Sequence, residues 1–412
     1  MIAGQTRILN FGYGAIFGTY WMIYAIISSF ASVFMLAKGY SNSQIGITLA
    51  AANVLAFIMQ PLVADFTDRS KKLGIITVTE GITALMMIIT IGMFAFKGGT
   101  LALCAVFVLL IAFHTVLQPL FNSLAFKLEA CGLSTNYGVA RSAGSLAYSI
   151  FVAVLGTLVE KFGITVMPVS GEIICALLIL SLAFTKKTFD RNRRRNRPAM
   201  PNTDGQEADG EGEEEIDLIL FIKRNKMFFL VNVGVIGLFF SNAILNNYMA
   251  QIVADVNGTT EDMGRILGVM AFLEIPTMVF FKSIKRYFPC RLLLKVASIA
   301  FTVKIALCWL AGSVGMLYVA QFFQIISFAL FLPGMVYFTD EIMSSGEAVK
   351  GQALFTTMIT LTTIFSSLLG GWILDAAGAK ALTFVAAVST AAGAAVIIAV
   401  IDKVKRRQMH AA

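Results

Sequence analysis

The chain has 412 residues, of which 58% are hydrophobic and only 14% are charged, and its mean hydropathy is +0.80. A soluble domain carries roughly a quarter charged residues, so this composition excludes an ordinary water-soluble protein. The formal net charge of +8 fits the excess of Lys and Arg on the cytoplasmic loops of membrane proteins, and we expect no nucleic-acid partner.

Uninterrupted apolar runs of helical length recur along the chain, as in Leu101–Phe121 and Ala381–Ile401. Backbone that faces lipid has to satisfy its own hydrogen bonds, so the spans are either helices or strands of a closed barrel. Barrel strands alternate polar and apolar residues over about ten positions, which these runs do not. The sequence therefore predicts an all-α polytopic membrane protein.

The apolar runs predict twelve transmembrane helices. The first run extends from Ile8 to Leu36, which is too long for the apolar part of a signal peptide. The predicted spans are 8–36, 44–64, 73–95, 101–125, 137–160, 164–185, 227–253, 262–284, 291–312, 314–338, 351–374 and 379–402.

Lys and Arg set the predicted orientation. With twelve spans, the basic stretches 69–72, 186–197, 282–291 and 403–407 fall on one side of the membrane, and the connections on the other side are poorer in cations. The positive-inside rule makes the richer side cytoplasmic. We therefore expect a multi-pass plasma membrane protein whose two termini are both cytoplasmic.

Two spans of the first half carry groups suited to a polar ligand. In span one, Tyr20 and Tyr24 can stack on a sugar or a base. In span four, His114, Gln118 and Asn122 stand four residues apart and so share one face of the helix. We predict that these five residues bind substrate, and hydrogen bonding between neighbouring helices is the alternative for the span-four residues.

Span five adds a cation to this set. Arg141 is followed by Ser145 at helical spacing, and a guanidinium can bind two hydroxyls or a carboxylate in a fork. We predict that both residues contact substrate. The alternative is that Arg141 lies near the cytoplasmic end of the helix and only follows the charge bias.

A long polar stretch divides the chain. Residues 186–226 are first basic and then acidic, which is typical of a solvated linker, and 216–226 can form a short interfacial helix. We predict a first six-helix bundle at 1–185, a cytoplasmic linker at 186–226 and a second bundle at 227–412. The halves resemble weak repeats, a pattern that places a substrate site at mid-depth between two pseudo-symmetric bundles.

Two ionisable residues and three amides stand inside spans of the second half. Glu274 and Lys304 are candidates for proton coupling, because a charge in the bilayer is costly and a carboxyl group held away from water can take up and release a proton. A fixed ion pair is the alternative. Asn242, Asn246 and Gln324 are predicted to bind a polyhydroxylated or nucleoside-like solute.

The chain resembles the major facilitator superfamily, and within it the branch of lactose permease and related oligosaccharide:proton and nucleoside:proton symporters. The similarity rests on the aromatic first span, on Gln60-Pro61-Leu62-Val63-Ala64-Asp65, and on Tyr137–Gly144 with Arg141 in the place of a sugar-binding arginine. Gln324 stands where the permease has a histidine.

The resemblance also implies a gate after span two. Asp65, Asp68, Arg69 and Lys72 are similar to the loop that closes the cytoplasmic side in this family. We expect Asp65 to cap a neighbouring helix there, with Arg69 as its partner.

Taken together, these patterns predict a secondary transporter that imports a sugar, an oligosaccharide or a nucleoside with a proton by alternating access. A proton-antiporting exporter of amphipathic compounds is the alternative. The chain has two histidines and five scattered cysteines and lacks a P-loop, so we expect no enzyme activity, no cofactor, no metal site and no disulfide. We expect the transporter to work as a monomer in the lipid bilayer.

Overall fold

A computed structural model of the chain describes residues 2–69, 74–96, 98–130, 137–195 and 218–404. Every regular element in these ranges is helical. The first part contains α1 (Ile2–Tyr24), η1 (Ala25–Ser29), α2 (Ala31–Ala37), α3 (Asn42–Arg69), α4 (Ile75–Ala95), α5 (Leu101–Ala130), α6 (Tyr137–Phe162) and α7 (Val166–Arg195). The second contains α8 (Leu218–Arg224), α9 (Lys226–Asp255), α10 (Thr260–Tyr287), α11 (Cys290–Leu310), α12 (Val314–Phe322), η2 (Phe323–Ile325), α13 (Phe328–Ile342), α14 (Ser345–Val400) and η3 (Ile401–Lys403).

Within these ranges, eleven helical segments are long and apolar enough to cross a membrane, and the last of them has 57 residues. A straight helix of that length would extend about 85 Å at 1.5 Å per residue, far beyond a hydrocarbon core of about 30 Å. The helix instead reverses at Gly378, whose φ of 78° is in the left-handed region that glycine tolerates. On one side of this reversal Ser367 O accepts from the hydroxyl of Tyr248 in α9, and on the other Ala386 O accepts from Ser241 in the same helix. The segment is therefore a hairpin of two spans, and the prediction of twelve spans is confirmed.

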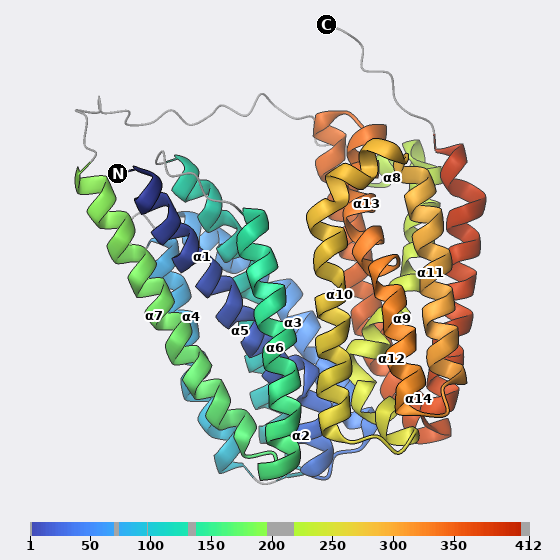
Figure 1. The fold of residues 1–412 in the computed structure, drawn as a ribbon, viewed down its shortest axis with the longest axis horizontal. Helices are drawn as coiled ribbons and strands as arrows, with labels where there is room; N and C mark the ends of the chain where they lie inside the picture. The colour runs from blue at the N-terminus through green and yellow to red at the C-terminus, as the bar shows by residue number, and fades with distance from the viewer. Residues whose placement is uncertain (1, 70–73, 97, 131–136, 196–217, 405–412) are drawn as a thin grey trace, which may run out of the picture.

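The spans form two bundles that lie side by side (Figure 1). The first half comprises the helices up to α7 and the second half those from α8 onward. The start of α1 and the end of η3 lie at the same end of the molecule, which we call the terminal face, and the other end is the opposite face. From the opposite face, the helices of the two halves diverge toward the terminal face (Figure 1).

Hydrogen bonds join the two halves near the opposite face. The carboxylate of Asp375 accepts from the backbone and side-chain amides of Asn42, at 3.1 and 2.9 Å, and from the backbone N–H of Ser43 at 2.7 Å. The carboxylate of Glu160 accepts from the backbone N–H of Thr260 at 3.0 Å. In each case an acidic residue of one half satisfies first-turn amides of a helix in the other half, where the helix dipole favours negative charge.

Three spans are interrupted within the described residues, and none of these breaks was predicted. The first span passes through the π-helical segment η1 between α1 and α2. Helix α9 has non-helical torsions at Tyr248. Span ten is divided into α12 and α13 by the short 3₁₀ helix η2. Such breaks release backbone groups from the helical pattern and are frequent at functional sites.

The end of span two differs from the prediction. Helix α3 continues to Arg69, so Asp65 and Arg69 lie on a helix and their assignment to a loop was wrong. The residue Lys72 is outside the described residues, and the side chain of Asp68 is likewise not described.

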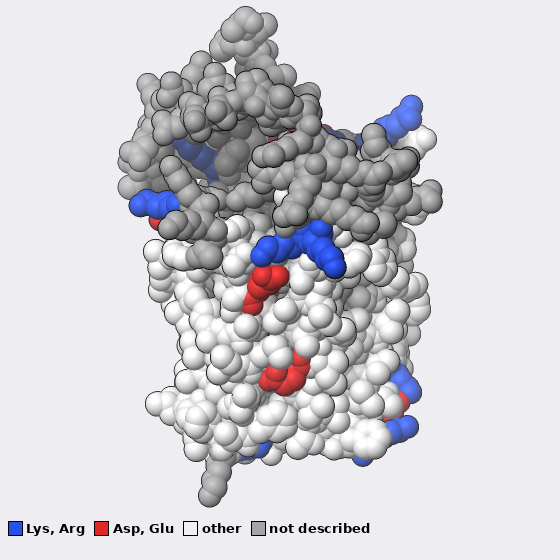
Figure 2. Space-filling view, turned by 90° about the vertical axis from the view of Figure 1, so that its left-hand side faces the viewer, with Lys and Arg blue, Asp and Glu red and all other residues white. Residues whose placement is uncertain are grey.

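The surface between the two ends is largely uncharged. Figure 2 shows the side of the first bundle, where white residues form a belt and Lys and Arg gather near its upper and lower edges. The short helix predicted within 216–226 is present as α8, and its Phe221 is buried in the core of the second half. The thiols of Cys104, Cys175, Cys290 and Cys308 form no disulfide, and Cys290 is the first residue of α11.

Candidate functional site

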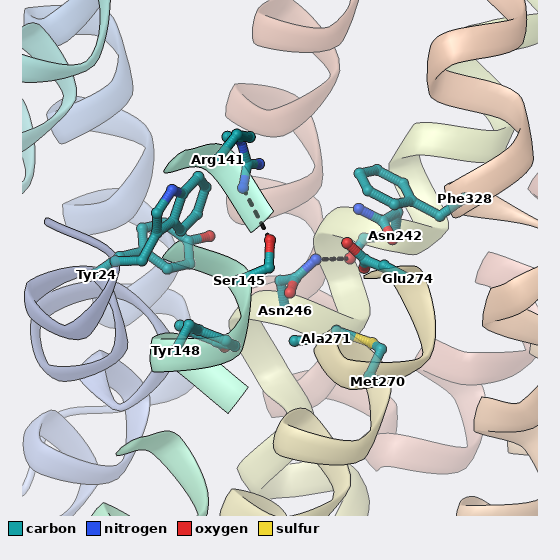
Figure 3. Close-up of a pocket in the computed structure, with 11 residues that line it drawn as sticks. Tyr24, Arg141, Ser145, Tyr148, Asn242, Asn246, Met270, Ala271, Glu274 and Phe328 are labelled. Carbon is teal, nitrogen blue, oxygen red and sulfur yellow. Dashed lines mark hydrogen bonds between the residues drawn. The ribbon is translucent and has the colours of Figure 1, made fainter. Parts of the chain in front are cut away.

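A cavity of about 180 Å³ lies between the two halves. Its lining comes from both of them (Figure 3). The lining residues are Trp21 and Tyr24 from α1, Arg141, Ser145 and Tyr148 from α6, Asn242 and Asn246 from α9, Met270, Ala271 and Glu274 from α10, and Phe328 from α13.

The wall from the first half is aromatic and carries one cation. The guanidinium of Arg141 lies 4.4 Å from the ring centroid of Trp21 and donates to the hydroxyl of Ser145 at 3.0 Å. Trp21 and Tyr24 make an edge-to-face contact with centroids 5.3 Å apart, and Tyr148 lies 6.0 Å from Tyr24. These contacts orient Arg141 toward the cavity (Figure 3), where a guanidinium can bind hydroxyl, carbonyl or carboxylate oxygens.

Gly144 of α6 allows the two helices of this wall to pack closely. A Cβ atom on Gly144 would lie 2.6 Å from Cδ1 of Trp21 and 3.3 Å from Cβ of Phe17. Helices α1 and α6 therefore approach closely at the depth of Arg141 and Ser145, as small residues permit at helix contacts in membranes.

The wall from the second half carries polar side chains beside the apolar Met270, Ala271 and Phe328. The side chains of Asn242, Asn246 and Glu274 line the cavity (Figure 3). The amide of Asn246 donates to the backbone oxygen of Asn242 at 2.8 Å, across one turn of α9. The cavity thus has amide groups and a carboxylate opposite its aromatic wall and its guanidinium.

A buried chain of hydrogen bonds leads away from Glu274. The amide nitrogen of Gln324 donates to the carboxylate of Glu274 at 2.7 Å, and the amide oxygen of Gln324 accepts from the ammonium of Lys304. Gln324 and Lys304 are 1% and 0% exposed, and neither belongs to the lining of the cavity. Sequence reasoning placed Gln324 with the substrate ligands, whereas the structure places it between the two proposed coupling residues.

The polar stripe of span four lies behind α1 and not in the cavity lining. The ring of His114 stacks on Tyr20 with centroids 4.1 Å apart, and its Nε2 lies 3.0 Å from the backbone oxygen of Tyr20. The hydroxyl of Tyr20 donates to Gln118 at 3.5 Å. In this conformation Tyr20, His114 and Gln118 therefore connect α1 to α5, and Asn122, half-buried on α5, is also absent from the lining.

The expected gating pair is present, but within a single helix. Arg69 Nε lies 2.7 Å from the carboxylate of Asp65, one turn earlier in α3, and both side chains are more than half exposed. A solvent-exposed pair of this kind contributes only about 0–1 kcal/mol. In this conformation Asp65 pairs along α3, and within the part of the chain that the structure describes it caps no neighbouring helix.

Five lining residues were missed by sequence reasoning, namely Trp21, Tyr148, Met270, Ala271 and Phe328. Tyr148 follows Arg141 by seven residues and Met270 precedes Glu274 by four, so helical spacing puts each on the face of a residue already chosen. That spacing was a usable signal. Phe328 follows the η2 break, and the sequence gives no sign of that break.

Comparison with known proteins decides the family. The sequence model of the MFS_1 like family matches residues 13–386. The chain belongs to this family. It is therefore a membrane transporter of the major facilitator type and not an enzyme, and the predicted fold and the predicted family are both confirmed.

Similar proteins agree with this assignment. An uncharacterized transporter of Bacillus subtilis, YwbF, is 22% identical over 352 residues, which cover 84% of this chain and 79% of the relative. A putative sugar efflux transporter of Deinococcus radiodurans is 30% identical over 134 residues, 32% of each chain.

Solved structures show the same fold. A mutant form of the nucleoside transporter NupG superposes with a TM-score of 0.73 at 15% identity, over 98% of this chain and all of that one. A bacterial homologue of the lysosomal transporter Spinster, in an inward-facing and unoccupied conformation, gives 0.69 at 14% identity over 99% of each chain.

Proposed function

We propose that this transporter is a proton-coupled symporter of a small polar organic solute, namely a sugar, an oligosaccharide or a nucleoside. The observation that carries the proposal is the composition of the cavity between the halves. One wall offers the aromatic faces of Trp21 and Tyr24, and the other offers the amides of Asn242 and Asn246. Aromatic faces stack on sugars and bases, and amides bind hydroxyls and ring heteroatoms.

Transport then follows from the placement of this cavity between two bundles. In the present conformation hydrogen bonds join the halves near the opposite face, as between Asp375 and Ser43, and the halves diverge toward the terminal face (Figure 1). Rocking of one half against the other would expose the same cavity alternately at each face. The unit boundaries that we propose for this motion are 1–185 and 227–412. Of the connection 186–226, α7 continues to Arg195 and α8 packs on the second half.

Glu274 is the proposed proton carrier. Its carboxylate lines the cavity on α10 and is bound by Gln324. Because it shares the cavity with the solute, its protonation changes the charge that the solute meets. The second member of the coupling site is Lys304, which is buried behind Gln324.

We further propose that the terminal face is cytoplasmic and that the transporter works as a monomer in the plasma membrane. Described cations near this face include Arg69, Lys186, Lys285 and Lys295, in agreement with the positive-inside rule. The present conformation is then inward-facing.

The proposal is tested by ligand binding. A ligand that binds the folded state raises the melting temperature by mass action, so purified protein is screened against sugars, nucleosides and hydrophobic cations. We expect stabilisation by a sugar or a nucleoside and its loss in Arg141→Ala. Arg265→Ala is the matched control, because Arg265 pairs with Glu261 on the same helix and does not line the cavity.

The exporter remains the second candidate, and two observations favour it. A relative that matches a third of the chain is named as a putative sugar efflux transporter, and Phe328, Met270 and Trp21 give the cavity an apolar portion. Stabilisation by hydrophobic cations, with none by sugars or nucleosides, would contradict symport of a polar solute and favour export.

A further inference from the structure

The link between the two proposed coupling residues is indirect. The ammonium of Lys304 lies 3.6 Å from the sulfur of Met270 and binds the amide oxygen of Gln324. Among the ion pairs of the described residues, none joins Lys304 to a carboxylate within 4.0 Å. The carboxylate of Glu274 is reached only across the side chain of Gln324, which donates to it at 2.7 Å.

The break in span ten holds Gln324 in this place. Gln324 is the middle residue of η2. The next residue, Ile325, accepts a hydrogen bond through its backbone oxygen from Thr277 at 2.9 Å. Thr277 follows Glu274 by three residues, so it lies beside Glu274 on one face of α10. Two hydrogen bonds thus tie η2 to this face of α10, and a third ties it to Lys304 on α11.

The amide is suited to its two neighbours. A glutamine side chain has a donor end and an acceptor end, and here the donor meets an acid while the acceptor meets an ammonium. Hydrogen bonds to ionised groups are about twice as strong as neutral ones. The charge of Lys304 therefore fixes which way the amide points, and the amide in turn fixes the Glu274 carboxylate at the edge of the cavity.

We infer that Gln324 is a positioning residue of the coupling site, through which Lys304 acts on Glu274, and not a ligand of the transported solute. This inference rests on the proposed symport. When Glu274 takes up a proton from water, it loses the negative charge that holds the amide donor, and the change reaches Lys304 and η2 through Gln324. The other charged or titratable groups around Glu274 are Arg141 and Tyr148 on α6 and Tyr24 on α1.

Gln324→Met tests the inference, because methionine keeps the length of the side chain and removes both hydrogen bonds. In proteoliposomes we expect accumulation of solute driven by a pH gradient to fall about tenfold or more, the loss that corresponds to one hydrogen bond to a charged group. Counterflow exchange without a gradient should stay within about threefold of wild type, since the cavity lining is unchanged. If Gln324 had only a structural role, the substitution would lower accumulation, exchange and the yield of folded protein alike.

A matched control is available one turn away. Gln321 is also a buried amide, but it donates to the backbone oxygen of Leu317 and to the sulfur of Cys308 and touches neither coupling residue. Gln321→Met should keep the ratio of accumulation to exchange at the wild-type value.

The double variant tests whether Lys304 acts through Gln324. Lys304→Met alone should resemble Gln324→Met, and the variant with both changes should be no worse than either, since residues in one chain of contacts are not additive. Full additivity of the two losses, or accumulation by Gln324→Met at the level of Gln321→Met, would overturn the inference.

A spectroscopic readout separates this inference from the proposed function. The infrared band of the Glu274 carboxyl group is assigned by its disappearance in Glu274→Gln, and it depends on the hydrogen bonds that the group makes. It should shift in Gln324→Met and in Lys304→Met but not in Gln321→Met. If the band shifts and no solute is accumulated by wild type, the link stands and symport is wrong. If wild type accumulates solute and the band does not shift, the link is wrong.

Discussion

At the scale of single residues, Arg141 has a proposed role that lysine cannot fill. Its planar guanidinium stacks on Trp21 while it donates to Ser145, whereas a lysine ammonium is a compact charge without the planar fork. We expect Arg141→Lys to weaken solute binding about tenfold or more, the size of one lost hydrogen bond to a charged group, in equilibrium binding by the purified protein. Arg265→Lys should bind as wild type. Unchanged affinity of Arg141→Lys would show that the cavity wall does not use the guanidinium.

Residue roles were predictable from sequence only in part. Helical spacing identified Arg141, Ser145, Asn242 and Asn246, which all line the cavity. The same spacing identified His114 and Gln118, but these residues contact Tyr20 of α1 and do not line the cavity. Periodicity shows which residues share a face of one helix, but the helix that this face meets depends on packing of the whole bundle.

At the scale of elements, two acidic residues hold the halves together at the opposite face. Removing their charge leaves first-turn amides of α3 and α10 without an anionic partner. Each contact of a carboxylate with a helix N-terminus stabilises the closed arrangement of this face by about 0.3–1 kcal/mol. We expect Asp375→Asn with Glu160→Gln to raise the population open at the opposite face by a few-fold. The measurement is the distance distribution between spin labels at positions 161 and 255, which are exposed residues of different halves near that face.

The control for these charges is Asp65→Asn, since among the described residues Asp65 pairs with Arg69 on its own helix. It should leave the distance distribution near the opposite face unchanged. A distribution that also stays unchanged in the double variant would mean that the acidic contacts do not hold that face closed.

A second contact between elements depends on the absence of side chains. A Cβ on Gly264 of α10 would lie 2.6 Å from the backbone oxygen of Val152 in α6 and 2.9 Å from the Cα of Gly156. We therefore expect Gly264→Leu to force α6 and α10 apart and to hold the opposite face open, with longer distances between the same two labels. Gly81→Leu is the control, because nothing lies within 4 Å of a Cβ at Gly81. Equal distributions for the two variants would contradict this packing.

The elements themselves were predictable where composition decides them. Long apolar runs and the distribution of cations gave twelve spans, which the structure contains. The breaks at η1, Tyr248 and η2 were not predictable, because the residues there are ordinary helix-compatible ones and tertiary contacts decide the local torsions. The end of α3 was misjudged for a related reason, since a polar sequence was taken for a loop although it continues the helix to Arg69.

At the scale of the whole molecule, the fold explains why one site can serve both sides of a membrane. Each bundle contributes one wall of the cavity. Rotation of one bundle against the other therefore changes which face gives access to the cavity, while each wall stays intact within its bundle. Within this frame Arg141 and Glu274 face the same cavity from different halves (Figure 3). In the proposed cycle, binding of a solute across the cavity and protonation of Glu274 both shift the balance between the two conformations.

The most direct test of this account is uptake by proteoliposomes that contain the wild-type protein or Glu274→Gln, measured with and without an inwardly directed proton gradient. Wild type should accumulate a sugar or a nucleoside above the external concentration only when the gradient is present. Glu274→Gln should exchange the same solute but fail to accumulate it. Accumulation by Glu274→Gln at the wild-type level would contradict the assignment of Glu274, and solute uptake by wild type that ignores the gradient would contradict proton-coupled symport.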